Sequence, residues 1–200
     1  MKQPVVRSFL GAALVGMSVL VSFGETYYWQ GDDWGLYSDP ANWLIGGPDG
    51  TAATTCPGET DTLYNSQDFS FDLGGGEGKF GTWDTTNGWV DRKLFVRNGT
   101  LTATKVSTHR SYIEVYDGGL FKIADSLIAS DGDASPHRVT VHAGGEMQML
   151  CSFSLYKIVM NIEKDGKLLF NPSWFGIKGT SAQNSTIDVA GELEAPNGVK

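Results

Sequence analysis

The feature that most constrains the fold is a short unit that the second half of the sequence repeats. In each copy, two stretches of alternating apolar and polar residues flank a glycine turn. The clearest copy runs from Ile113 to Ile123 as Ile-Glu-Val-Tyr-Asp-Gly-Gly-Leu-Phe-Lys-Ile. The last glycines of the successive turns are Gly99, Gly119, Gly145, Gly166 and Gly191, which gives spacings of 20, 26, 21 and 25 residues. A period of this length is typical of a solenoid.

Alternation with a period of two indicates strands with one buried face. A meander of independent hairpins would alternate too, but it has no reason to return to the same glycine in every repeat. One coil of a parallel β-helix needs about this much chain, and coils stacked about 4.8 Å apart pair each strand with its equivalent. The sequence therefore predicts an all-β fold, a right-handed single-stranded parallel β-helix (β-solenoid), over residues 92–200. Short apolar runs at 126–129 and 153–156 are candidates for a third strand in each repeat.

The first 24 residues predict a signal peptide. Lys2 and Arg7 precede an uncharged apolar run over 9–23, and Ser22 and Gly24 place small residues at the positions that specify cleavage. We expect cleavage after Gly24. The alternative is an uncleaved membrane anchor, but the run is shorter than the about 20 residues of a membrane span. We therefore expect an exported protein, in the periplasm, on the cell surface or outside the cell, with no membrane span after cleavage.

Residues 25–91 predict a turn-rich, aromatic cap on the first coil. This region holds twelve carboxylates and one base, Lys79, for a charge of 1 − 12 = −11, whereas residues 92–200 carry 12 − 11 = +1. Such an acidic region disfavours binding to nucleic acid and to anionic membrane surfaces. Cations, glycans and cell-surface proteins remain as partners.

Aromatic side chains are the first candidates for ligand binding. Five of the six tryptophans lie within the first 89 residues, namely Trp29, Trp34, Trp43, Trp83 and Trp89. A tryptophan face can stack on the apolar face of a sugar ring. A cap over the first coil needs large aromatic side chains as well, because each buries about 150–250 Å². Both roles stay open for these residues.

Carboxylates on turns are the second candidates, for a metal ion. The turn carboxylates Asp32, Asp33, Asp39, Asp49 and Asp61 offer the oxygen ligands that Ca²⁺ prefers. Asp32, Asp33 and Asp39 are the chosen set, with Asp131-Gly132-Asp133 as a weaker second site. Their spacing matches neither an EF-hand nor a calcium-binding β-roll. Aspartates at turns more often bond their own backbone, so we expect no cofactor and keep Ca²⁺ as the alternative.

Signals for catalysis are weak. The sequence has no nucleophile elbow, zinc-protease motif or phosphate-binding loop. The acids and bases of the repeat region are scattered among positions where a strand meets solvent. Cys56 and Cys151 have no metal-site spacing, and whether they form a disulfide is left open. These observations favour a protein without enzymatic activity.

The repeat, together with the cap motifs Trp29-Gln-Gly-Asp32, Asn42-Trp43 and Asp61-Thr-Leu63, resembles exported bacterial β-helix proteins whose repeats are similar to autotransporter passenger domains. The resemblance covers residues 25–200, and the sequence lacks the translocator barrel that follows such passengers. The chain stops in mid-repeat at 195–198, which suggests either a fragment of a longer protein or a tail that covers the last coil. An open end coil would let copies dimerise or stack.

The resemblance implies an adhesin-like or structural surface protein without catalytic activity. The alternative is a carbohydrate-binding or polysaccharide-degrading β-helix protein with a pectate-lyase-like architecture. A truncated product without function is the third possibility.

Overall fold

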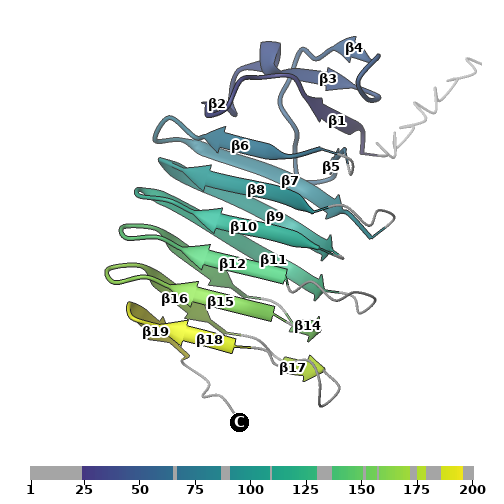
Figure 1. The fold of residues 1–200 in the computed structure, drawn as a ribbon. Coiled ribbons are helices and arrows are strands. Elements are labelled where there is room, and N and C mark those ends of the chain that lie inside the picture. The colour runs from purple at the N-terminus through teal and green to yellow at the C-terminus, as the bar shows by residue number, and fades with distance from the viewer. Residues whose placement is uncertain are drawn as a thin grey trace, which may run out of the picture.

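The computed structural model describes residues 24–64, 67–86, 91–108, 110–129, 137–150, 152–156, 158–171, 175–178 and 186–195. The fold is all-β, and stacked parallel coils form a solenoid beneath an N-terminal cap (Figure 1). This confirms the predicted β-solenoid class. In the part of the chain that is described, no helix is long and apolar enough to cross a membrane.

One wall of the solenoid is sheet B, whose seven described strands follow the order β18-β15-β12-β10-β8-β6-β2. The bounds of these strands are β2 (Gly35–Leu36), β6 (Phe69–Asp72), β8 (Arg92–Arg97), β10 (Ser111–Val115), β12 (His137–Val141), β15 (Ile158–Ile162) and β18 (Thr186–Val189).

The other wall is sheet A, with the main order β19-β16-β13-β11-β9-β7-β5-β1-β3-β4; β14 and β17 continue from β11 off this path. The bounds of its twelve described strands are β1 (Thr26–Trp29), β3 (Trp43–Ile45), β4 (Thr51–Ala52), β5 (Thr62–Leu63), β7 (Glu77–Asp84), β9 (Gly99–Thr108), β11 (Gly119–Ala129), β13 (Glu146–Met149), β14 (Ser152–Tyr156), β16 (Lys167–Phe170), β17 (Phe175–Lys178) and β19 (Glu192–Glu194).

Each coil runs along a strand of sheet B, turns at its glycine and returns along sheet A. Consecutive coils pair in parallel and in register, so that Ile113 of β10 lies between Leu94 of β8 and Val139 of β12. Of the predicted third strands, 153–156 lies within β14, whereas 126–129 is the second half of the continuous strand β11, after a register shift at 123–126. β14 pairs in parallel with that half of β11, and β17 pairs in parallel with β14. β6 and β7 form the first coil whose two strands both pair in parallel with the coil that follows, and they lie inside the range that the sequence assigned to the cap.

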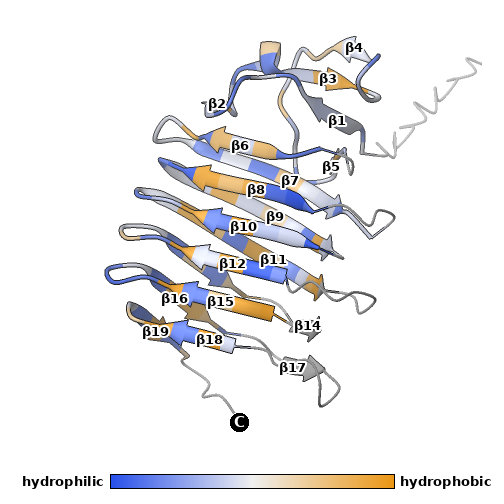
Figure 2. Cartoon of the chain, in the orientation of Figure 1, coloured by the Kyte–Doolittle hydropathy of each residue, from blue (hydrophilic) through white to orange (hydrophobic). Residues whose placement is uncertain are grey.

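The core lies between the two sheets, where the inward residues of successive coils form columns. The alternation that places them is visible along the strands in Figure 2. In sheet B one column is fully buried and consists of Phe71, Val96, Val115, Val141 and Ile162. The facing column of sheet A contains Leu101, Phe121, Met147 and Leu168. Each such side chain stabilises the fold by about 1.5–3 kcal/mol relative to its exposed state.

The repeated glycines are required by the closeness of the coils. A Cβ on Gly145 would lie 2.4 Å from the carbonyl oxygen of Val115 in the preceding coil, and a Cβ on Gly191 would lie 2.2 Å from that of Gly166. Both distances are far below contact between a carbon and an oxygen. The periodic glycine is therefore a consequence of stacking.

The cap closes the N-terminal end of the core. β1 pairs antiparallel with β3 and parallel with β5, which joins the cap to sheet A. A short 3₁₀ helix, Pro40–Asn42, precedes β3. Trp43 is fully buried and its ring contacts those of Tyr27, Trp29, Tyr37 and Phe71. These aromatic rings cover the first coil, as a solenoid end requires.

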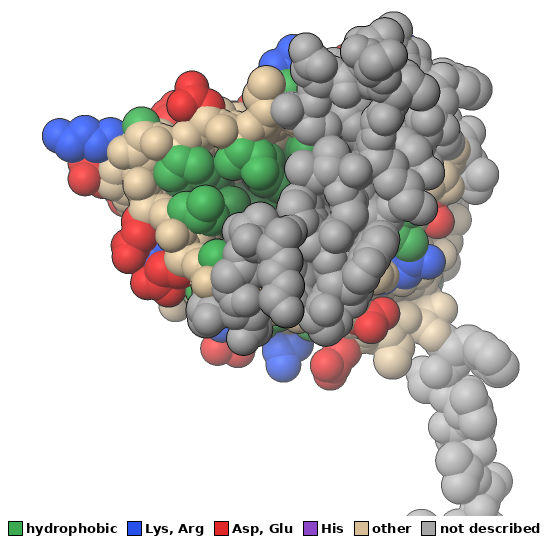
Figure 3. All heavy atoms as spheres, turned by 90° about the horizontal axis from the view of Figure 1, so that it is seen from below, with side chains coloured by type: hydrophobic (Ala, Val, Ile, Leu, Met, Phe, Trp, Pro, Cys, Tyr) green, Lys and Arg blue, Asp and Glu red, His purple; other side chains and the backbone are tan. Residues whose placement is uncertain are grey.

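At the opposite end, the last described coil exposes apolar side chains. Ile187, Val189 and Leu193 are 42 %, 37 % and 43 % exposed. They continue the inward columns, since Ile187 pairs with Met160 and Leu193 with Leu168. Figure 3 views this end and shows hydrophobic side chains on its surface, with acidic side chains around them.

We predict that Gly145→Ala lowers the free energy of unfolding by about 1–3 kcal/mol, because the methyl group overlaps the Val115 carbonyl. In a chain of this size each kcal/mol corresponds to a fall in Tm of about 2–4 °C, which thermal unfolding followed by circular dichroism measures. Gly58→Ala is the matched control, because its nearest neighbour would lie at 3.4 Å. Equal melting of the two variants would contradict the prediction.

Candidate functional site

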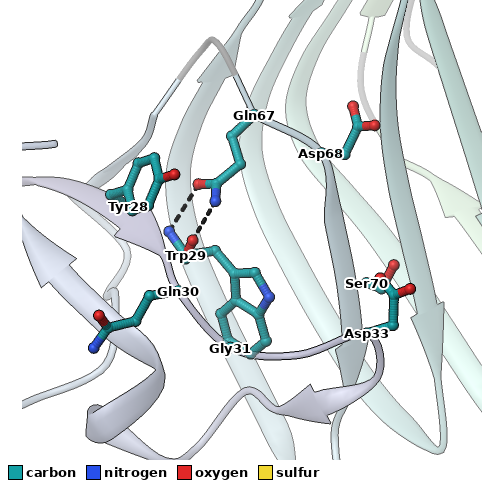
Figure 4. Close-up of a pocket in the computed structure, with 8 residues that line it drawn as sticks. All are labelled: Tyr28, Trp29, Gln30, Gly31, Asp33, Gln67, Asp68 and Ser70. Carbon is teal, nitrogen blue, oxygen red and sulfur yellow. Dashed lines mark hydrogen bonds between the residues drawn. The ribbon is translucent and has the colours of Figure 1, made fainter. Parts of the chain in front are cut away.

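Two adjoining hollows lie where the cap meets the outer face of sheet B. The first, of about 440 Å³, is lined by Tyr28, Trp29, Gln30, Gly31, Asp33, Gln67, Asp68 and Ser70 (Figure 4). The second, of about 390 Å³, is lined by Asp33, Trp34, Asp68, Ser70, Lys93, Phe95 and Tyr116. Asp33, Asp68 and Ser70 line both hollows, so we treat them as one continuous site and call it the junction groove.

The cap side of the junction groove is a tight turn after β1. The Gly35 N–H donates to the Asp32 carbonyl over 2.9 Å and closes the turn. Gly31 is needed here because its Cβ would lie 2.5 Å from the Trp29 ring. Trp34 has φ of 62°, a left-handed conformation that costs of order 1–3 kcal/mol for a residue other than glycine. The contacts of its ring with the outer face of the solenoid offset this cost.

The solenoid side of the groove is fixed by hydrogen bonds to the backbone. The Trp29 N–H donates to Gln67 Oε1 over 2.8 Å, and Gln67 Nε2 donates back to the Trp29 carbonyl, as Figure 4 shows. Asp68 Oδ1 accepts from the Lys93 N–H over 3.0 Å. Ser70 is an outward residue of β6 and pairs in register with Phe95 of β8. The lining is therefore held in place by the register of the coils.

A row of aromatic rings extends from the groove down the outside of sheet B. The Trp34 ring centroid lies 6.3 Å from that of Phe95 and 5.0 Å from that of Tyr116. Tyr116 in turn stacks on His142 at 4.3 Å with 21° between the planes. The Arg97 guanidinium lies 4.4 Å from the centre of the Trp34 ring, a cation–π contact. This row attaches the cap loop to several coils at once.

Beside the aromatic row, an acid–histidine network links successive coils. His142 Nε2 lies 2.9 Å from Glu114 Oε2, and His142 Nδ1 lies 3.2 Å from Glu163 Oε1. The Tyr116 hydroxyl donates to Glu114 Oε2 over 2.6 Å. Both ring nitrogens of His142 are thus engaged by carboxylates of the neighbouring coils. The network therefore serves to connect the coils.

A second connection lies one coil higher, between Asp72 and Arg97. Arg97 Nε donates to Asp72 Oδ2 over 3.0 Å, and the Gly74 N–H and Asn98 Nδ2 donate to Asp72 Oδ1. Burial acts to raise the pKa of Asp72, but these three hydrogen bonds and the Arg97 charge together hold it below its ordinary value. Asp72 thus has a structural role, because both of its oxygens accept hydrogen bonds from neighbouring residues.

The predicted tryptophans have different surroundings. Trp29 is 5 % exposed and Trp43 and Trp83 are 0 % exposed, so their ring faces pack into the core and the cap. Trp34 is half-buried and lines the groove. Trp89 lies outside the described residues. Only Trp34 among the described four can offer a large part of its side chain to a ligand.

The predicted calcium ligands do not come together. Asp39 Oδ1 accepts from the Ala41 N–H over 2.9 Å and caps the 3₁₀ helix. Asp32 is exposed at the turn and Asp33 lines the junction groove. Within the described ranges, no group of three or more His, Cys, Asp or Glu residues is placed to hold a metal ion. Asp131 and Asp133 lie outside those ranges.

Of the two cysteines, Cys56 is a half-buried free thiol whose pKa is raised, first by burial and then by the nearby Asp39 carboxylate. Cys151 lies outside the described residues.

Sequence reasoning missed most of the groove. Gln67, Asp68, Ser70 and Lys93 are ordinary polar residues in strands or just before them, and only the register of the coils brings them together. Phe95 was the one detectable signal, because it occupies an outward position between the inward Leu94 and Val96. A large aromatic residue at such a position indicates that something covers it or binds to it.

Comparisons of the chain with protein-family models, with curated proteins and with solved structures gave no match.

We predict that Tyr116→Phe reduces the loss of stability at high pH. Burial and the hydrogen bond to Glu114, followed by the Glu114 and Glu163 charges, raise the pKa of Tyr116 from 10.0 to about 12. The neutral phenol is therefore favoured in the folded state, and the stability that it contributes is lost as pH rises from about 10 to about 12.

Chemical denaturation at intervals from pH 9 to pH 12 measures this loss. Tyr112→Phe is the control, because Tyr112 is an outward residue of β10, the strand that ends just before Tyr116, and takes no part in the network. Parallel pH profiles for wild type and Tyr116→Phe would contradict the prediction.

Proposed function

We propose that the chain is an exported, non-catalytic β-solenoid of the cell surface or extracellular space, with an adhesin-like role in which the junction groove binds the ligand. The groove is the observation that carries the proposal. It combines aromatic side chains with carboxylate, amide, hydroxyl and ammonium groups on a surface whose backbone is fixed by the coils. The predicted signal peptide and the predicted resemblance to autotransporter passengers support export. If the groove binds no ligand, the same exported solenoid has a purely structural role.

The chemistry of the groove favours an uncharged glycan as the ligand. Asp33, Asp68 and Gln67 can accept hydrogen bonds from sugar hydroxyls, and Phe95 and Tyr116 offer apolar surface to the C–H face of a ring. The charge of −11 over residues 25–91 opposes binding of polyanions. The groove consists of two adjoining hollows, which suits a chain of sugar rings better than a single small molecule.

A polysaccharide-cleaving enzyme is the second candidate. The observation that favours it is that two carboxylates, Asp33 and Asp68, and one lysine, Lys93, line the same hollow. Asp68 already accepts the Lys93 N–H, and no described histidine lines either hollow. Incubation with neutral and acidic polysaccharides, with product sizes measured by chromatography, separates the two candidates. Release of short products by wild type but not by Asp33→Asn would favour the enzyme.

Glycan-array binding tests the groove directly. We predict that the wild-type protein binds neutral glycans and that Ser70→Trp reduces this binding at least tenfold, because the indole fills the part of the groove shared by both hollows. Thr140→Trp is the matched control, because Thr140 is an outward residue in the same column, reached through Phe95 and Glu114.

Binding that survives Ser70→Trp would place the ligand elsewhere. Absence of binding to every glycan would leave a protein ligand or a structural role.

The exposed end coil supplies a candidate contact between copies. A partner that covers Ile187 and Leu193 has to pair with β18 or β19 and present apolar residues at alternate positions. The same coil of a second copy meets both requirements. We predict concentration-dependent dimers in sedimentation velocity, and their loss in Ile187→Asp. Val159→Asp, which places the same charge on the outer wall of β15, is the control. A monomer at all concentrations would contradict this contact.

A further inference from the structure

The backbone nitrogen of Glu25 is held by a carboxylate. It donates to Asp61 Oδ1 over 2.8 Å. Asp61 Oδ2 accepts from the Gly58 N–H over 2.7 Å, and the Thr62 N–H donates to the Glu25 carbonyl over 2.7 Å. The Asp61 side chain is thus fixed through both oxygens, and Glu25 is bonded to the loop at 58–62 through both its nitrogen and its carbonyl.

Glu25 is also the residue that the predicted cleavage would leave at the N-terminus of the mature protein. We propose that Asp61 is the receptor for the α-ammonium group that is created when the signal peptide is cleaved after Gly24. This inference rests on the proposed export of the chain. It gives a role to Asp61, a carboxylate that does not line the junction groove.

The chemistry of the step is a peptide-bond hydrolysis with water as the co-reactant and a host signal peptidase as the catalyst. The bond between the Gly24 carbonyl carbon and the Glu25 nitrogen breaks. The hydroxyl group of water goes to the Gly24 carbonyl carbon, and its proton goes to the Glu25 nitrogen. At neutral pH that nitrogen takes one more proton and becomes a cation at the position where the amide stood.

The surroundings favour a cation at this position. Residues 25–91 contain a single base against twelve carboxylates. Among the described side chains, no lysine, arginine or histidine forms an ion pair with Asp61. The charges of Asp61 and Glu25 also reach Tyr27, whose pKa is raised first by burial and further by these two carboxylates. An ammonium on Asp61 would partly neutralise this local negative charge.

The ion pair would anchor the strand on which the cap is built. β1 joins the solenoid side of sheet A through two residue pairs with β5, Thr26 with Thr62 and Tyr27 with Leu63. The amide N–H of the uncleaved chain already donates to a charged carboxylate, and an ammonium donor adds the Coulombic attraction between opposite charges. Cleavage therefore tightens the attachment of the cap at its first residue.

The two states of the nitrogen can be told apart by pH. An amide N–H donor does not titrate near neutrality, so in an uncleaved chain the contribution of Asp61 is the same at pH 6.5 and pH 9.5. An ammonium donor stabilises the fold while it keeps its proton, and this contribution is lost as pH rises above the range of a free α-amine, about 7.7–8.0.

The experiment expresses the full chain of residues 1–200 in an exporting bacterial host and determines the N-terminus of the purified product. Glu25 is the expected first residue. Wild type and Asp61→Asn, both produced from the full precursor, are then compared by thermal unfolding between pH 6.5 and pH 9.5. The expected result is a difference in Tm that is largest at the lower pH and shrinks as pH rises. Asp49→Asn, an exposed aspartate on a cap turn, is the control for removal of one negative charge.

A second measurement needs no variant and covers the case in which Asp61→Asn does not fold. The α-amine of the exported wild-type protein is acetylated with acetic anhydride at pH 7, and its rate is compared with that of a peptide of residues 25–30. An ion-paired amine whose pKa is raised by one unit reacts about tenfold more slowly.

Glu25 at the N-terminus together with a Tm difference that does not depend on pH, or with equal acetylation rates, would overturn the ion pair and leave the proposed export standing. A product with another N-terminal residue would overturn the ion pair as well. A chain that stays uncleaved inside the cell would overturn both proposals.

Discussion

The solenoid depends on how closely its coils approach one another at the turns. Strands in a sheet lie about 4.8 Å apart, and at the turns this spacing leaves no room for a side chain. The Cβ positions of Gly119, Gly145 and Gly191 would lie 2.8, 2.4 and 2.2 Å from backbone carbonyl oxygens of the coil before them. The glycines keep every coil in the same register, and that register stacks the inward residues into buried columns and the outward residues into rows.

Much of the fold could be predicted because its signals are local. The alternation around Ile113 and Val115 and the return of the glycine are visible in the sequence, and both were sufficient for the parallel solenoid. The site was harder, because it depends on residues that only the register brings together. Ser70 and Phe95 lie 25 positions apart in sequence and are neighbours on adjacent strands. Composition also could not separate the buried Trp43 from the half-buried Trp34, since their difference is set by the direction in which the backbone points each ring.

The distinctive chemistry of the molecule is concentrated at the capped end. On the walls lower down, polar contacts and stacked rings connect one coil to the next, as in the contacts of His142 with Glu114, Glu163 and Tyr116. Contacts of this kind stabilise the stacking of coils in any solenoid. The cap instead brings a turn with a strained tryptophan against the outer face of sheet B and forms the groove. The surface that departs most from the repeated pattern thus lies where the cap interrupts the repetition.

The position of Trp34 also bears on how the molecule comes apart. In a stack of repeats each coil is stabilised mainly by its immediate neighbours, so the stack can fray from an open end while the remainder stays folded. Trp34 contacts Phe95 in one coil and Tyr116 in the next, and Tyr116 carries the contact on to His142. These rings couple the cap to coils that it does not directly cover. The cap and the upper coils therefore form one cooperative unit.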